Sequence, residues 1–412
     1  MSELEHCFIT GSAQMMRGHA AESAPAWERV LAIDPRHYWA LGNLAHALYA
    51  QGDHDRADAV QIQRARLHGD NLVSQIVATD LLMNAGDQRG AQAVAERVPA
   101  LLTSATLEER WIADVWLAFW EACGAFAAHE SVQLRALADR AAASIRDADH
   151  ASPGDASAHG YGTGSYYQAG LVYLSLGMVS RAEVMFALPA NDAERYQYLA
   201  LAAHLRGDDV KARLYLRQMA AGGFARAMPF AGVLFVDVGL VQDAERLVKV
   251  WERGRWWPDP FIAPARARIL LARGRRIEAL ETVNKALPVL EKGWGEPWVA
   301  TVTTASTQVL QALRLKARML RDNGQLGAAI EVLETAEAHT PLLCSAQRFA
   351  GVEWLGLRAD LLDLYRQGHR VQAAAALAHE LQDALSQADT KDVFGWLALS
   401  PELTAALRTG DK

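Results

Sequence analysis

The stretch "WALGNLAHALYAQGDHDRADAV", residues 39–60, contains the pattern that decides the fold. A small residue, Ala45, is followed after three residues by the apolar Leu48, after four more by Gly52 and after five more by Ala57. The same frame recurs 34 residues earlier and 34 residues later along the chain. Such a period is typical of helical repeat arrays, so the sequence predicts stacked repeat units rather than one continuous globular core.

The frame continues through nine candidate units. Their glycines are Gly18, Gly52, Gly86, Gly177, Gly207, Gly239, Gly274, Gly324 and Gly368. A small residue in a first helix and an alanine in a second one let two antiparallel helices approach closely, and glycine suits the left-handed or unhindered backbone where the first helix ends. Each pair must stack on its neighbours to bury its apolar faces. We therefore expect an all-α fold, a right-handed α-solenoid of about nine to ten antiparallel helix pairs.

These residues resemble the tetratricopeptide repeat family. The first unit matches the family pattern with Gly11, Gly18, Trp27 and Pro35, and the eighth with Ala317, Gly324, Ala329, Ala336 and Pro341. Other units depart from it, since Arg64, Trp251 and Glu380 stand where the family has a small residue in the second helix. The resemblance implies a non-catalytic scaffold that binds a peptide or a partner protein in its concave groove.

In the family, four positions of each first helix face the groove, and steps of three and four residues do share one face of a helix. The resemblance therefore implies a groove lined by Trp39, His46, Tyr49, Tyr167, His204, Phe261, Arg268, Arg314, Arg318, Arg321, Arg358 and Tyr365. The family's clamp for chaperone tails is not implied, because only Asn43 matches its residues, whereas Phe8, Ser12, Val73 and Val77 occupy the other places.

Arginines dominate the C-terminal part of this expected groove. Residues 251–322 hold 13 Lys and Arg against 7 Asp and Glu, although the whole chain has a net charge of -7. Arg314, Arg318 and Arg321 share one helix face and predict an electropositive wall for acidic groups of the partner, since guanidinium groups bind carboxylates bidentately. The alternative is a solvated helix face, or pairing with neighbours such as Asp322 and Glu353.

The spacing of the units predicts the domain organisation. We expect an N-terminal block at 1–147 with three regular repeats and one degenerate helical pair, a linker or inserted loop at 148–162, a C-terminal block at 163–400 and a tail at 401–412. The insert is rich in Gly, Ser and His, but it lacks the lysine and the spacing of a phosphate-binding loop. A flexible linker is the main interpretation, and an anion site at the start of the following helix is the alternative.

Other classes of function find little support in the sequence. No motif of a hydrolase or metalloprotease occurs and no histidine spacing fits zinc, so no enzyme activity, catalytic residue, cofactor or metal is predicted. Three scattered cysteines, no secretory signal and no apolar run of bilayer length predict a cytoplasmic protein without membrane insertion. The negative net charge argues against a nucleic-acid partner. The oligomeric state stays open.

Two alternatives to a scaffold also stay open. Residues 265–293 resemble the helical effector domains of large bacterial transcription activators, which would make the chain an effector-binding sensor. An enzyme with its site in the groove or at the 150–165 loop is less favoured.

Overall fold

The computed structural model covers the whole chain and describes most of residues 2–384. Residues 18, 20, 52, 85–86, 128–130, 152–163, 190–193, 225–226, 255–258, 293–302, 339–343, 346–347, 350 and 385–412 lie outside the described part. Residues 152–162 of the expected linker and the whole tail therefore fall outside it, whereas residues 148–151 of the expected linker belong to a helix.

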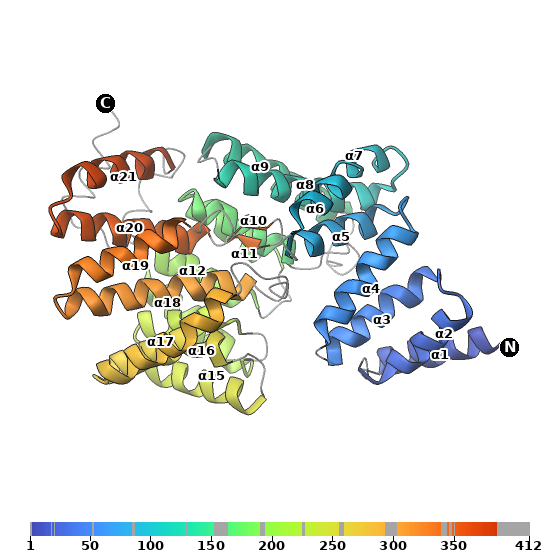
Figure 1. Cartoon of the computed structure of the whole chain (residues 1–412), viewed down its shortest axis with the longest axis horizontal. Coiled ribbons are helices and arrows are strands. Elements are labelled where there is room, and N and C mark those ends of the chain that lie inside the picture. The colour runs from blue at the N-terminus through green and yellow to red at the C-terminus, as the bar shows by residue number, and fades with distance from the viewer. Residues whose placement is uncertain are drawn as a thin grey trace. The chain divides into compact units, whose positions relative to one another are not determined.

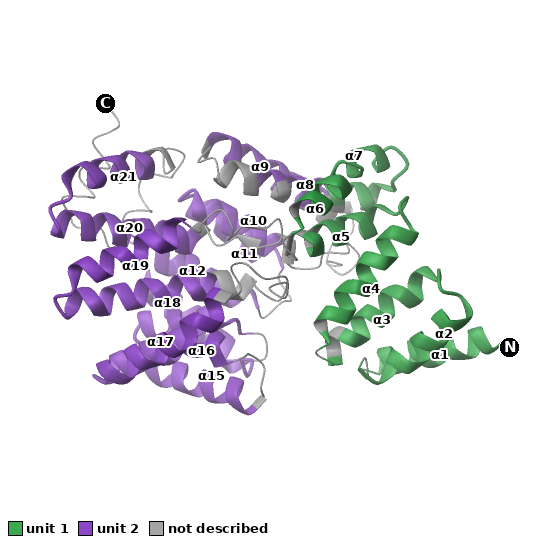
Figure 2. Ribbon diagram, in the orientation of Figure 1, with its two compact units in different colours: residues 1–113, 296–300 green, residues 114–295, 301–412 purple. Residues whose placement is uncertain are grey.

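The described residues up to Ala113 form a first compact unit (Figures 1 and 2). Its elements are α1 (Glu3–Met16), the 3-10 helix η1 (Ala21–Ser23), α2 (Ala24–Ile33), α3 (Tyr38–Gln51), α4 (His54–Leu67), α5 (Leu72–Asn84), α6 (Gln88–Ala95) and α7 (Val98–Leu101). Helices α1 and α2, α3 and α4, and α5 and α6 pack as three successive hairpins. The boundary to the second unit falls inside α8 (Leu107–Ala127).

The second unit contains the rest of α8 and all the following helices (Figure 2). They are α9 (Ser131–Ala151), α10 (Gly164–Ser175), α11 (Val179–Ala187), α12 (Arg195–Leu205), α13 (Asp209–Ala221), α14 (Pro229–Asp237), α15 (Val241–Gly254), α16 (Asp259–Ala272), α17 (Arg276–Lys292), α18 (Thr303–Asp322), α19 (Leu326–Ala338), α20 (Gly351–Gln367) and α21 (Val371–Ala384). Two short antiparallel strands, β1 (Cys344–Ser345) and β2 (Arg348–Phe349), separate α19 from α20.

The expected all-α solenoid is confirmed. In the described part of the chain, α1 to α6 form three helix pairs, α8 and α9 form the degenerate one, and α10 to α21 form six. The compact units divide at residues 113 and 114, whereas the repeat spacing predicts a division at 147, and α9 packs against α10 of the second unit. The α16–α17 hairpin, which covers the stretch that resembles effector domains, follows the same plan as its neighbours.

Five repeat glycines have the left-handed backbone that the pattern predicts. Gly177, Gly207, Gly239, Gly274 and Gly324 end their first helices with φ between 72° and 84°. The alanine five residues after each of them is fully buried. Glycine is favoured there because other L-residues meet a steric penalty at positive φ.

The last helix pair corrects the expected frame by one residue. His369, with φ of 55°, takes the left-handed position, and Gly368 does not. The backbone N–H of His369 donates to the carbonyl of Arg366, as the backbone N–H of Gly324 donates to the carbonyl of Arg321. Histidine visits this region more readily than most residues, so the bend survives without glycine. The sequence frame, anchored on Gly368, therefore misplaces the inward positions of α20, including those expected for Arg358 and Tyr365.

Replacing Gly324 by alanine tests the left-handed bend. Nothing lies within 4 Å of the Cβ that alanine would add, so backbone strain alone should count. We expect Gly324→Ala to lower the free energy of unfolding by about 1 kcal/mol, because the left-handed strain exceeds the entropy that alanine removes from the unfolded chain. The matched control is Gly327→Ala on the exposed start of α19, which should stabilise by about 0.5 kcal/mol. Urea unfolding of both variants checks the opposite signs.

Glycines within the first helices make room for large side chains of the second helices. A Cβ on Gly11 would lie 2.7 Å from the ring of Trp27, and one on Gly232 would lie 3.1 Å from the ring of Trp251. A Cβ on Gly170 would overlap the ring of Phe186. In these three pairs an aromatic ring of the second helix thus packs against the small residue of the first helix, and the three rings are fully buried.

Candidate functional site

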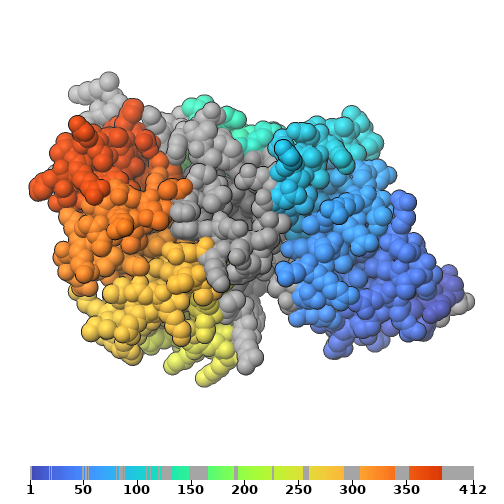
Figure 3. Space-filling model, in the orientation of Figure 1, coloured from blue at the N-terminus to red at the C-terminus, as the bar shows by residue number. Residues whose placement is uncertain are grey.

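The first helices of the second unit pack against one another. Helix α18 contacts α14, α16 and α20, and α10 contacts α20. In the space-filling view, the yellow, orange and red atoms of α16 to α21 lie against one another (Figure 3). Side chains on these inner faces are therefore placed between helices of the same unit.

Two aromatic residues that were expected in the groove lie in the core of this unit. Tyr167 on α10 is 2% exposed and stacks on Tyr198 with ring centroids 4.3 Å apart. Phe261 on α16 is also buried. Packing of neighbouring first helices removes both rings from solvent, so neither offers a surface in this conformation.

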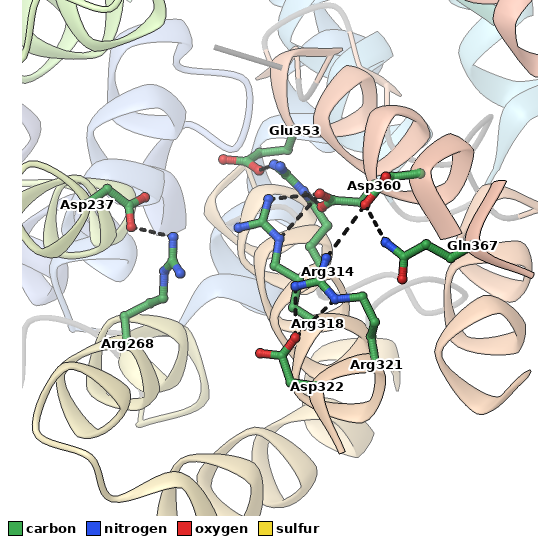
Figure 4. A network of polar contacts seen from close by, with 10 residues as sticks. Asp237, Arg268, Arg314, Arg318, Arg321, Asp322, Glu353, Asp360 and Gln367 are labelled. Atoms are coloured by element: carbon green, nitrogen blue, oxygen red, sulfur yellow. Dashed lines mark hydrogen bonds and ion pairs between the residues drawn. The ribbon is translucent and has the colours of Figure 1, made fainter. Parts of the chain in front are cut away.

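The expected wall of arginines is an internal ion-pair network (Figure 4). Arg314 on α18 donates to Glu353 at 2.6 Å and to Asp360 at 2.7 Å, both on α20. Arg318 donates to Asp360 at 2.9 Å. The side chains of Arg314 and Asp360 are only 16% and 17% exposed. The alternative of pairing with neighbours is thus what the structure shows for these arginines, and they join α18 to α20.

Burial and pairing act on Asp360 in opposite directions. Burial alone would raise the pKa of the Asp360 carboxyl, but the charges of Arg314 and Arg318 and their hydrogen bonds more than offset it, so its pKa is lowered. Burial likewise opposes the charge of Arg314, and its two carboxylate partners raise its pKa nonetheless. Both groups are charged at neutral pH, as a buried pair with good hydrogen bonds requires.

Arg358 belongs to a second internal cluster. It is almost fully buried on α20, donates to Glu337 of α19 at 2.6 Å and pairs with Glu380 of α21 at 2.8 Å. Its guanidinium lies over the ring of Trp354, 3.9 Å from the centroid. Glu380, which counts as a departure from the family pattern only in the frame anchored on Gly368, is thus an ion-pair partner of Arg358.

The remaining polar residues of the expected groove in this unit also have partners within the chain. Arg268 pairs with Asp237, and Arg321 pairs with Asp322 at 2.9 Å (Figure 4). Nδ1 of His204 lies 2.7 Å from Asp209.

Tyr365 likewise has an internal partner. Its hydroxyl donates to Glu334 at 2.9 Å. Burial and this hydrogen bond to a carboxylate raise the pKa of Tyr365 to about 12. The histidine, the arginines and Tyr365 that were expected in the groove of the second unit thus each have an acid of this chain as a partner.

The first unit differs, because expected groove residues there face solvent. Trp39 on α3 is 62% exposed, and its described ring contact is edge-on to Tyr38. His46, seven residues further along α3, is exposed on the same side of the helix. The side chain of Tyr49 lies outside the described residues. Trp39 and His46 are therefore the two expected site residues that the structure leaves open.

Arg64 lies beside these two residues, and the sequence interpretation did not place it in the groove. Its guanidinium reaches from α4 over α3, where it lies 3.8 Å from the centroid of the Tyr38 ring. A Cβ on Gly42 would lie 2.8 Å from Nη1 of Arg64. The guanidinium thus occupies the place of the absent side chain at residue 42, between Trp39 and His46 along α3. A signal existed, since Arg64 stands at a position where the family has a small residue.

The described residues give no sign of a metal site or a membrane span. They contain no group of three or more His, Cys, Asp or Glu side chains placed to hold a metal ion. None of their helices is both long enough and apolar enough to cross a bilayer.

The hairpins, the left-handed bends and the buried small-to-large contacts define the class as a tetratricopeptide-type α-solenoid. Solved structures that are similar include a tetratricopeptide repeat protein from Parabacteroides merdae, with 13% identity over 76% of this chain and 99% of that chain and a TM-score of 0.34. Another is yeast Tom70, with 14% identity over 99% of both chains and a TM-score of 0.32. No family model matches the sequence, and no curated protein matches it. The class therefore rests on the helices and their packing.

Proposed function

We propose that the chain is a non-catalytic protein-interaction scaffold that binds an extended peptide segment of a partner protein on the face of α3 that carries Trp39 and His46. The observation that carries the proposal is the exposure of Trp39 at a position where the repeat pattern places groove residues. Tryptophan is among the residues that contribute most to protein interfaces, because a rigid ring buries a large area at little entropic cost.

The contrast between the two units supports this location. In the second unit the corresponding side chains are buried or bonded within the chain, as for Tyr167 and Arg314. In the first unit Trp39 and His46 are exposed, and Val73 of α5, one repeat after Trp39, is half-buried. An aromatic and aliphatic face with a few polar groups suits side chains of an extended peptide. The arginines of the second unit give no reason to expect an acidic partner, because they already hold carboxylates of this chain.

Truncating Trp39 tests the proposal. Peptides are selected from a random dodecapeptide library on the immobilised full chain, and their affinities are measured by fluorescence anisotropy. We expect Trp39→Ala to weaken binding tenfold or more, since loss of a central aromatic anchor costs about 2 kcal/mol. Its unfolding free energy should change by about 0.5 kcal/mol or less, because the ring is mostly exposed.

The control is Ile33→Ala on α2, an apolar side chain that is 47% exposed and lies outside the α3 face. It should leave peptide affinity within about twofold of the original chain. Selected peptides that bind Trp39→Ala as well as the original chain would contradict the proposed location. Failure to select any peptide would contradict peptide binding itself.

A further inference from the structure

Two arginines of this chain lie over glycines in the same way. The guanidinium of Arg314 occupies the place of a side chain at Gly356, and that of Arg64 occupies the place of a side chain at Gly42. Each arginine reaches across from a neighbouring helix onto the helix that carries the glycine. The two sites therefore offer an internal comparison of what surrounds such a guanidinium.

The surroundings of the two guanidinium groups differ in their charged partners. At Gly356, the residues three before and four after the glycine are Glu353 and Asp360, and both carboxylates bind Arg314. At Gly42, the residues at the same two steps are Trp39 and His46. No carboxylate of the described residues pairs with Arg64. The site on α3 thus repeats the arrangement on α20 without its two acids.

The described contacts of Arg64 leave hydrogen-bonding capacity unused. Its described polar contacts are a long hydrogen bond from Nη1 to Gln61 at 3.4 Å and an interaction with Tyr38, over whose ring it lies. Its Nε is buried without a hydrogen-bond partner. Burial lowers the pKa of Arg64, and Tyr38 opposes that change only in part. A half-buried guanidinium that pairs with no carboxylate of the described residues gains more from a bidentate carboxylate than a fully solvated one does.

We infer that Arg64 binds a side-chain carboxylate of the partner peptide, with a neighbouring apolar residue of that peptide on Trp39. This inference rests on the proposed function and adds the chemical class of the ligand. Because Gly42 has no side chain, the guanidinium of Arg64 can lie against α3 between Trp39 and His46, where a peptide bound on that face would meet it. His46 lies four residues beyond Gly42 on the same side and adds a hydrogen-bonding group at the edge of the site.

The test compares variants of the full chain against one peptide library. Random dodecapeptides with free C-termini are selected on the original chain and on Arg64→Gln. We expect peptides selected on the original chain to be enriched in Asp and Glu, and enrichment to vanish on Arg64→Gln. For a resynthesised peptide, Arg64→Gln should weaken binding tenfold or more, and so should replacing the peptide's Asp or Glu by Asn or Gln. Making both changes together should weaken binding by less than the product of the two separate effects.

Two further variants separate binding from folding. Arg66→Gln removes the same charge from an exposed position two residues along α4 and should leave affinity within twofold. Arg64→Lys keeps the charge but loses the planar fork, so it should bind with intermediate affinity. Circular dichroism checks that each variant keeps its helices. If Arg64→Gln unfolds, the peptide affinity of Arg64→Lys tests the inference in its place.

The outcomes distinguish this inference from the proposed function. Peptides that depend on Trp39 but not on Arg64, or that carry no acidic residue, overturn the inference and leave the proposed function standing. Peptides that depend on neither residue overturn both. A peptide that loses affinity on C-terminal amidation, but not on replacement of its acidic side chains, overturns the assignment to a side-chain carboxylate.

Discussion

Asp360→Asn is expected to lower the free energy of unfolding by about 3 kcal/mol, because it removes the shared acid of a buried ion-pair network. Asp360 accepts hydrogen bonds from Arg314 and Arg318, and its carboxylate holds α20 against α18. The asparagine has nearly the same shape, so the loss reports the charge rather than the packing. Urea unfolding followed by circular dichroism measures the effect.

The matched control is Asp322→Asn. Asp322 pairs with Arg276 and Arg321, but its side chain is 44% exposed. Exposed ion pairs contribute little, so this variant should lose less than about 1 kcal/mol. Equal losses from the two substitutions would show that the α18–α20 network behaves as a solvated surface pair.

The effect of Asp360 should also depend on pH in a defined direction. Its pKa in the folded chain is lowered from the ordinary value of 3.8 because two arginines outweigh the effect of burial. A lowered pKa adds stability at pH values above the unfolded pKa, and this contribution is lost as the pH falls through the folded value. The difference in stability between the original chain and Asp360→Asn should therefore be constant near neutrality and shrink below about pH 4. A difference that grows in acid would contradict the assignment.

The repeat frame predicted the helix pairs because each pair is encoded locally. Gly324, for example, has the left-handed backbone at the bend between α18 and α19. The glycine and the alanine five residues after it are close in sequence, so the pattern of such a pair can be recognised without the rest of the chain. The ion pairs are different, because the acids that bind Arg314 lie 39 and 46 residues away in sequence. Helical spacing places Arg314 on a face, but only the contact of α18 with α20 shows what covers that face. An arginine expected to meet a partner protein therefore pairs with two acids of its own chain.

Two details of the site escaped prediction for related reasons. In the last pair, the sequence pattern places the left-handed residue at Gly368, whereas the structure has it at His369. Glycine is the residue expected there, but histidine also adopts this backbone conformation. In the first unit, the sequence pattern shows Arg64 only as a departure from the family's small residue. Its meaning depends on Gly42, which lies on another helix, so a pattern read one helix at a time separates the two.

The second large effect is expected at Gly170, where alanine should lower the free energy of unfolding by about 3 kcal/mol. The added Cβ would overlap the ring of Phe186, which is fully buried on α11. That ring also lies 5.4 Å from Tyr198 between centroids, so it has little freedom to move aside. Either α10 must separate from α11, or Phe186 must leave its preferred rotamer.

Combining Gly170→Ala with a smaller residue at 186 separates this clash from a general loss of glycine. Phe186→Leu alone should destabilise by about 1 to 2 kcal/mol, because it leaves a cavity beside Tyr198. In the double variant the new methyl group occupies part of that cavity, so the combined loss should be smaller than the sum by about 1 to 3 kcal/mol. Additive losses would show that Gly170 acts through its backbone and that the packing of a small residue against a large one does not hold this hairpin together.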